Sequence, residues 1–131
     1  MKSNESWEKA LRCAQAALDK KAHDLVILEV GDFTSVADYF VICTGRSDIQ
    51  VQAICRAIEE VLAKAGIKPL AIEGFTHGQW VLIDCGDVVI HIFYETARQF
   101  YNLEGLWGQA PQRSLPEPYN SQAQHLRIAT A

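Results

Sequence analysis

Residues 80–93 read WVLIDCGDVVIHIF, and this stretch decides the fold. It contains two largely apolar runs, residues 80–85 and 88–93, on either side of the pair Gly86-Asp87. A glycine at the first of two central positions suits a type II′ turn. The stretch therefore predicts an antiparallel β-hairpin whose register is fixed by its two-residue turn.

The predicted hairpin has two unequal faces. The face expected to form the core, under the helices, is wholly apolar and consists of Val81, Ile83, Cys85, Val88, Ile90 and Ile92. The opposite face is mixed and consists of Trp80, Leu82, Asp84, Val89, His91 and Phe93. With helices only on the core side, the mixed face is expected to be open. Trp80 and Phe93 then make it a candidate docking surface, because aromatic anchors dominate interface energetics. The alternative is that a terminal segment covers it.

Apolar periodicity outside the hairpin predicts further helices and strands. Helices are expected over residues 6–21, 47–65 and 97–103, and strands over residues 25–28, 39–43 and 70–72. Ser6 and Thr96 are the predicted caps of the first and third helices. The second helix opens with a capping box, Ser47 with Gln50, and ends at Gly66.

This order, α-β-β-α-β-β-β-α, predicts an α/β (α+β) fold with one mixed five-stranded sheet and helices packed mainly on one face. The chain has 131 residues, enough for one domain. Residues 1–108 are predicted to form that domain. Residues 109–131, which contain three of the four prolines, are predicted to be a polar, loosely held tail.

Composition excludes several classes of protein. Hydrophobic residues make up 49% of the chain and charged residues 21%, which is typical of a globular protein. The apolar runs are too short for a membrane span, and the polar N-terminus lacks a signal-peptide pattern, so a cytoplasmic location is expected. The four cysteines form no CxxC motif, and we expect them to be buried as small apolar side chains.

Charge is distributed unevenly along the chain. The net charge is −4, so sequence-specific nucleic acid binding is not expected. Residues 69–97 contain four acidic residues and no Lys or Arg, and residues 22–45 are similarly acidic. The strand-rich part of the molecule therefore suits a basic partner. Simple solvation of loops and strand ends is the alternative explanation.

No catalytic or metal site is predicted. The junction Thr44-Gly45-Arg46-Ser47 resembles the Gly-Ser turn that nucleotidyltransferases place before a helix, but those enzymes also need a pair of carboxylates for two metals. Only Glu73 is available on the following strand. The four histidines are scattered, and His91 is expected to lie near Asp84 on the mixed face. The sequence therefore indicates a binding protein without a cofactor; an active nucleotidyltransferase-like enzyme is the alternative.

Several blocks of this sequence are similar to the Iojap-like ribosomal silencing factor family. They match the family in order and spacing and consist of residues 37–47 (ADYFVICTGRS), 50–54 (QVQAI), 73–74 (EG), 80–84 (WVLID), 86–91 (GDVVIH), 98–101 (RQFY), 103–104 (LE) and 106–107 (LW). The resemblance implies a nucleotidyltransferase-like core that lacks the catalytic metal site.

The resemblance also implies a function. Members of the family bind the large ribosomal subunit through its protein conventionally numbered fourteen, on the face that meets the small subunit, and so block subunit association and repress translation. The expected partner-binding residues are Trp80, Leu82, Asp84, His91 and Phe93, extended by Tyr94, Arg98, Tyr101 and Trp107. A homodimer or self-associating scaffold that uses the same face, with a role in large-subunit assembly, is a further alternative.

Overall fold

The strands form one mixed sheet across residues 4–120 and 122, the residues that the computed structural model describes. Within them, six strands lie in the order β3-β4-β5-β2-β1-β6. The elements along the chain are α1 (Asn4–Asp19), β1 (His23–Glu29), β2 (Tyr39–Gly45), α2 (Asp48–Lys64), β3 (Ala71–Glu73), β4 (Trp80–Asp84), β5 (Val88–Tyr94), α3 (Glu95–Tyr101), α4 (Leu103–Leu106) and β6 (Gln112–Arg113). The mixed α/β fold predicted from the sequence is confirmed, with one strand more than expected.

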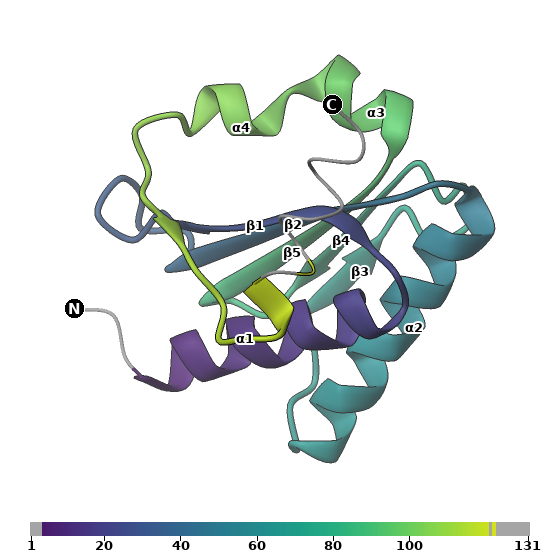
Figure 1. The fold of residues 1–131 in the computed structure, drawn as a ribbon. Coiled ribbons are helices and arrows are strands. Elements are labelled where there is room, and N and C mark those ends of the chain that lie inside the picture. The colour runs from purple at the N-terminus through teal and green to yellow at the C-terminus, as the bar shows by residue number, and fades with distance from the viewer. Residues whose placement is uncertain (1–3, 121, 123–131) are drawn as a thin grey trace.

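The centre of the sheet is the parallel pair β2 and β5. Tyr39 pairs with Val88 at one end and Gly45 with Tyr94 at the other. All residues of β2 are buried, and in β5 only Tyr94 is partly exposed. Parallel strands that are buried on both faces need cover on both sides. Figure 1 shows this cover: α1 and α2 lie on one side of the sheet, and α3 and α4 on the other.

The hairpin of β4 and β5 has the register that the sequence predicts. Ile83 pairs with Ile90, and Leu82 pairs with His91. Gly86 in the turn has a φ of +83°, which glycine adopts without a steric penalty. The six apolar residues of the predicted core face all belong to the main core beneath α1 and α2. The alternation of the two faces is therefore confirmed.

Helix α2 begins and ends at the predicted signals. The backbone N–H of Gln50 donates to Ser47 Oγ at 3.0 Å, and Gln50 Oε1 accepts from the backbone N–H of Arg46 at 2.6 Å. Gly66, just after the helix, has a φ of +74°, the left-handed conformation common at helix C-termini. The apolar stripe of α2 is buried against the sheet and consists of Val51, Ile54, Cys55, Ile58 and Leu62.

Helix α1 begins before the predicted cap, and Ser6 has a different role. Ser6 lies inside the helix, where its Oγ is 2.6 Å from Asp87 Oδ2 and 3.0 Å from Asp38 Oδ2. Lys9 Nζ lies 2.6 Å from Asp87 Oδ1. Burial works to raise the pKa of Asp87, but the hydrogen bonds from Lys9 and Ser6 outweigh it and hold that pKa below its usual range. These contacts join α1 to the turn between β4 and β5.

The expectation of helices mainly on one face is confirmed for the two long helices, but the other face is also covered. The two long helices share a face, but α3 and α4 pack over the other face and close a second apolar core there. Thr96 does not cap α3, which begins at Glu95 with Tyr94 as its N-cap residue and without a capping side-chain hydrogen bond. The face of the hairpin predicted to be open is therefore largely covered.

Within its described residues, the segment after residue 108 is anchored to the domain at several points, unlike the loose tail expected from its composition. Strand β6 pairs with β1, and Leu115 is buried in the main core. The guanidinium of Arg113 lies 4.2 Å from the ring centre of Trp7 and forms an ion pair with Glu29 at 3.6 Å. The pattern of prolines and polar residues concealed this packing, which depends on single apolar side chains. Residues 121 and 123–131 lie outside the described part of the chain.

We expect Ile83→Ala and Ile90→Ala each to lower the free energy of unfolding by roughly 2–5 kcal/mol, because both side chains are fully buried in the main core. Ile49→Ala, at a residue that is 73% exposed, is the matched control and should change it by about 0.5 kcal/mol or less. Urea denaturation measures all three. Equal midpoints for the buried and exposed variants would show that the core is assigned to the wrong face.

Candidate functional site

The mixed face of the hairpin belongs to the side of the sheet that the α3–α4 segment covers. Phe93 is fully buried there and His91 is only 4% exposed, so neither lies on the surface as the sequence analysis expected. Trp80, Leu82 and Asp84 on strand β4 remain partly exposed. The cause is that β5 is a central strand covered by α3, whereas β4 lies nearer the edge of the sheet.

Trp80 and His91 are joined by a hydrogen bond on this face. The indole Nε1–H of Trp80 donates to His91 Nδ1 at 3.2 Å, so the neutral imidazole carries its proton on Nε2. His91 Nε2 is buried and has no hydrogen-bond partner among the described residues. The ring of Phe40 lies edge-on at 5.1 Å between ring centres. Burial lowers the pKa of His91 to about 4, so this imidazole is neutral near pH 7.

The expected proximity of Asp84 and His91 does not produce a pair. Asp84 Oδ1 instead accepts from the backbone N–H of Gly86 at 2.8 Å and thus supports the hairpin turn. Diagonal neighbours on adjacent strands can be within reach, but here the carboxylate accepts from a local backbone donor, the Gly86 N–H.

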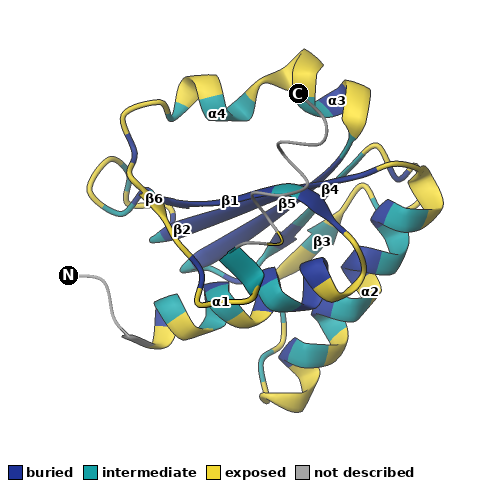
Figure 2. Cartoon of the chain, in the orientation of Figure 1, coloured by how far each residue is buried: buried dark blue, intermediate teal, exposed yellow. Residues whose placement is uncertain are grey.

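An exposed group of aromatic side chains, which we call the aromatic surface, consists of Trp80, Phe100 and Tyr101. The Trp80 and Tyr101 rings are 4.7 Å apart between centres, and the Phe100 and Tyr101 rings are 5.0 Å apart. Phe100 is 80% exposed and Tyr101 is 50% exposed. Figure 2 shows that α3 and α4 carry exposed and half-exposed positions along most of their length. Leu106 on α4 adds a further exposed apolar side chain, at 78%.

Phe100 was not among the predicted site residues, because the sequence contains only a partial signal for it, the adjacent aromatic residues at positions 100 and 101. Phe100 and Tyr101 are adjacent on a helix, and neighbouring helical positions point about 100° apart. Ala97 is the buried residue of α3, so this short helix cannot place two further large rings in the core. Adjacent aromatic residues on a one-sided helix therefore indicate exposed apolar surface.

The remaining predicted residues, Tyr94, Arg98 and Trp107, are half-buried and make contacts within the protein. The edge of Trp107 packs on Phe40, with 5.2 Å between ring centres, and Tyr94 is partly buried at the start of α3. The Arg98 guanidinium points inward and bonds to Glu104 and Thr44. Of the nine predicted residues, Trp80, Leu82, Asp84 and Tyr101 are the ones that best combine exposure with proximity to the mixed face.

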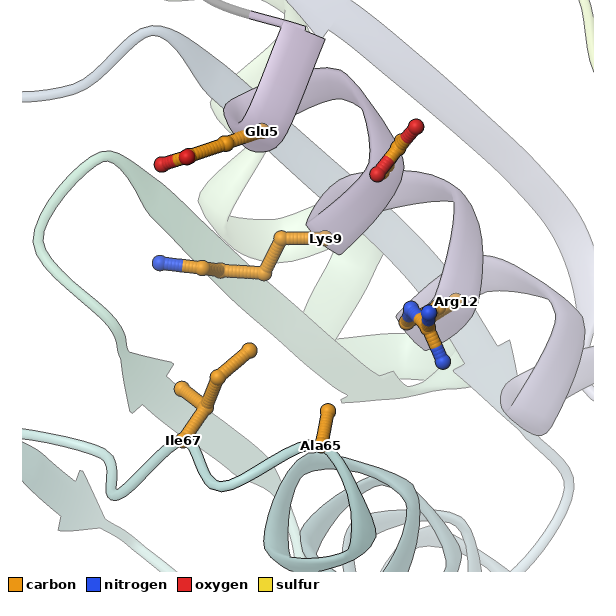
Figure 3. Close-up of a pocket in the computed structure, with 6 residues that line it drawn as sticks. Glu5, Lys9, Arg12, Ala65 and Ile67 are labelled. Carbon is orange, nitrogen blue, oxygen red and sulfur yellow. The ribbon is translucent and has the colours of Figure 1, made fainter.

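A cleft of about 280 Å³ lies elsewhere, between α1 and the end of α2, and Figure 3 shows its lining side chains. Glu5 and Glu8 are offset there by Lys9 and Arg12, so the cleft favours neither an anion nor a cation. Lys9 is already engaged with Asp87.

The described residues also offer no group of three or more His, Cys, Asp or Glu side chains that could hold a metal ion. All four cysteines are buried and free. Burial raises the pKa of Cys43 to about 12, which keeps its thiol protonated and unreactive. Ser47, in the junction that resembles a nucleotidyltransferase turn, is used as a helix cap. No helix within residues 4–120 and 122 has the length and apolar character needed to cross a membrane.

Comparison with known proteins gives a consistent result. Residues 3–130 match the family model described as "Ribosomal silencing factor during starvation". The chain is 49% identical over 106 residues to the ribosomal silencing factor RsfS of Bacillus subtilis, which covers 80% of this chain and 90% of the relative. It is 37% identical over 118 residues to the chloroplastic protein Iojap of Arabidopsis thaliana, covering 90% of this chain and 49% of that longer protein.

A solved structure has the same fold. The crystal structure of a protein from Chromobacterium violaceum superposes with a TM-score of 0.75 at 32% sequence identity, covering 92% of this chain and 98% of that chain.

The buried His91 predicts a pH-dependent stability. Its pKa is about 4 in the folded chain, against an ordinary value of 6.5, so between these two pH values the unfolded chain binds more protons. The free energy of unfolding should therefore fall by about 3 kcal/mol from this residue as the pH drops from 6.5 to 4. Urea denaturation at a series of pH values measures this slope.

His91→Gln should reduce that slope, because glutamine can accept the Trp80 hydrogen bond but does not titrate. Part of the slope should remain, since burial also lowers the pKa of His23. The depressed pKa of Asp87 adds its effect from about pH 5 downward, so it contributes at the acid end of this window in every variant. His77→Gln, in an exposed loop, is the control. A parent protein whose stability is flat between pH 6.5 and 4 would contradict the prediction.

Proposed function

Because the chain belongs to the ribosomal silencing factor family, we propose that it binds the large ribosomal subunit on the face that meets the small subunit, and so represses translation by preventing subunit association. Family membership supports this proposal, and the contact that we propose is the ribosomal protein conventionally numbered fourteen. The aromatic surface is the part of the molecule best suited to make that contact.

The exposed apolar area supports a docking role for the aromatic surface. Phe100 and Tyr101 lie on a short helix, and the Tyr101 ring contacts both the Phe100 and the Trp80 rings, so three large rings form one continuous patch. Aromatic side chains are enriched among the residues that dominate binding energy at protein interfaces. Trp80 is held in place by its hydrogen bond to the buried His91, which makes the patch rigid before a partner arrives.

The charge near this patch suits a basic ribosomal protein. Asp84 lies on the same face of β4 as Trp80 and is partly exposed, and the hairpin region carries no Lys or Arg from residue 69 to 97. Acidic groups around an apolar centre favour approach by a positively charged surface. They also disfavour direct binding to the phosphates of ribosomal RNA, so the proposed contact is with protein.

Repression by this route requires no chemistry. A folded domain seated on the intersubunit face occupies space that the small subunit needs, and the two then compete for one surface. The strength of repression depends on the affinity of this chain for the large subunit and on its concentration. We accordingly propose that the protein acts as a non-enzymatic regulator.

Removal of the exposed rings should weaken docking without unfolding the chain. An aromatic anchor is often worth about 2 kcal/mol or more, so Phe100→Ala and Tyr101→Ala should each lower affinity for large subunits roughly 30-fold. Ile49→Ala, which is comparably exposed but lies on α2, should bind like the parent. Co-sedimentation with purified large and small subunits measures this, with circular dichroism to verify folding. Folded Phe100 and Tyr101 variants that sediment like the parent would place the docking surface elsewhere.

Substitutions that remove or reverse the charge of Asp84 separate its electrostatic attraction to a partner from its structural role in the hairpin turn. Asp84→Asn removes the charge and keeps an oxygen for the Gly86 N–H, whereas Asp84→Lys reverses the charge and loses that hydrogen bond. Affinity should fall in the order parent, Asn, Lys, and its dependence on salt should flatten in the same order. Sedimentation across a salt series tests this. An Asn variant with the parent's affinity and salt slope would show that Asp84 faces no basic group.

The same rings could instead mediate association between two copies of this chain. Light scattering of the parent and of Phe100→Ala, with and without large subunits, distinguishes these uses. A parent dimer that is lost in the variant and that never binds large subunits would favour the scaffold alternative over silencing.

A further inference from the structure

Arg98 joins four separate segments of the chain. Its side chain is only 11% exposed. Nε and Nη2 donate to the two carboxylate oxygens of Glu104, each at 2.9 Å, in a bidentate pair. Nη1 donates to Thr44 Oγ1 at 2.7 Å and to the backbone carbonyl of Asp24. The guanidinium thus connects α3 to α4, to the end of β2 and to the start of β1.

A bulge in β1 supplies one of these acceptors. The register with β2 shifts between His23 and Val26, and Asp24 within the shift has a φ of +49°. In a regular ladder the Asp24 carbonyl would be directed toward a neighbouring strand, but the bulge directs it to Arg98. Aspartate tolerates the left-handed conformation better than most residues, which fits its presence at this position.

Helix α4, which follows the turn at Asn102, supplies another acceptor, the Glu104 carboxylate. Asn102 has a φ of +46° and its backbone N–H donates to the Arg98 carbonyl at 2.9 Å, which ends α3. Helix α4 has four residues, Leu103–Leu106, and none of them is buried. A single helical turn is unstable on its own, so α4 depends on contacts outside itself. The Glu104 carboxylate held by Arg98 is a charged contact of this kind, and Trp107 on Phe40 is an apolar one.

We propose that Arg98 is a positioning residue for docking: together with the β1 bulge and Thr44 it fixes α4 and the end of α3, and thereby sets the relative placement of Tyr101, Phe100 and Leu106. This inference rests on the proposed function, because it assigns Arg98 an indirect role in the same contact. Arg98 touches no partner in this scheme; its guanidinium is used inside the chain.

The arrangement requires arginine and not merely a positive charge. A planar guanidinium can donate to both oxygens of one carboxylate from one edge and to two further acceptors from Nη1. A lysine ammonium has three donors on a flexible stem and cannot reproduce the bidentate geometry. Arg98→Lys therefore keeps the charge and removes the geometry, while Glu104→Gln removes the other half of the pair.

The first measurement needs no ribosome. Amide hydrogen exchange should accelerate in Arg98→Lys and Glu104→Gln at Gly105 and Trp107, whose N–H groups bond within the α4 turn. Exchange in the central strands β2 and β5 should stay unchanged. Arg56→Lys on α2, where the guanidinium lies 5.0 Å from the ring centre of Phe75, is the matched control and should leave α4 unaffected. Unchanged exchange in α4 of the Arg98 and Glu104 variants would overturn the proposal.

The second measurement is co-sedimentation with large subunits. Arg98→Lys and Glu104→Gln should each weaken binding about tenfold, the size expected for a lost charged hydrogen-bond pair. The double variant should bind no more weakly than Arg98→Lys alone, because that substitution already disrupts the Glu104 pair along with the contacts to Thr44 and Asp24. Faster exchange in α4 with unchanged affinity would overturn the docking role of Arg98. If the variants show the faster exchange in α4 but the parent binds no large subunits, the proposed function is refuted. The Arg98 contacts would then have a structural role only.

Discussion

The parallel pairing of β2 with β5 constrains every other element of this protein. Both strands are buried on both faces, and a parallel connection between them requires a long crossover. The chain meets that requirement with α2, β3 and β4, and then needs cover on the second face as well. Helix α1 with α2 supplies one layer and α3 with α4 the other. The two apolar cores, one on each side of the sheet, follow from this single pairing.

The second layer is thin, and that gives the α3–α4 segment two roles. It is built from one short helix and one helical turn, which bury few residues, so much of its apolar surface remains exposed. The inner side closes over Phe93 and His91, while the outer side presents Phe100 and Leu106. A thicker second layer would have buried these aromatic side chains. Because this layer buries few residues, polar contacts are needed to hold it on the sheet. These contacts are Trp80 with His91 and Arg98 with Glu104.

Sequence patterns predicted the local and periodic features of the fold well. The hairpin register and the Ser47 cap depend on neighbouring residues, so the spacing of a few side chains was sufficient for both. The role of Ser6 could not be read in this way, because its partners Asp38 and Asp87 are distant in the sequence. The cover over Phe93 was missed for the same reason, since nothing in the period of β5 specifies which later segment returns to it.

The candidate site was predictable in part. Trp80 and Tyr101 were named from the sequence, and they are neighbours in the structure. Phe100 was missed, because a short helix with a single buried residue gives too weak a period to divide its inner and outer positions. His91 and Arg98 were expected at the surface, but both have internal partners that only the tertiary structure brings within reach.

The place of β6 has a consequence for the order in which the chain can fold as it is synthesised. Residues 27 and 28 of β1 pair on their outer edge with residues 113 and 112, near the end of the described chain. Until those residues leave the ribosomal exit tunnel, that edge of β1 has open backbone donors and acceptors. An exposed strand edge is a template for pairing with another chain. A nascent chain whose residues 112 and 113 have not yet emerged therefore exposes an unpaired edge of β1, and the pairing of β6 is what covers it.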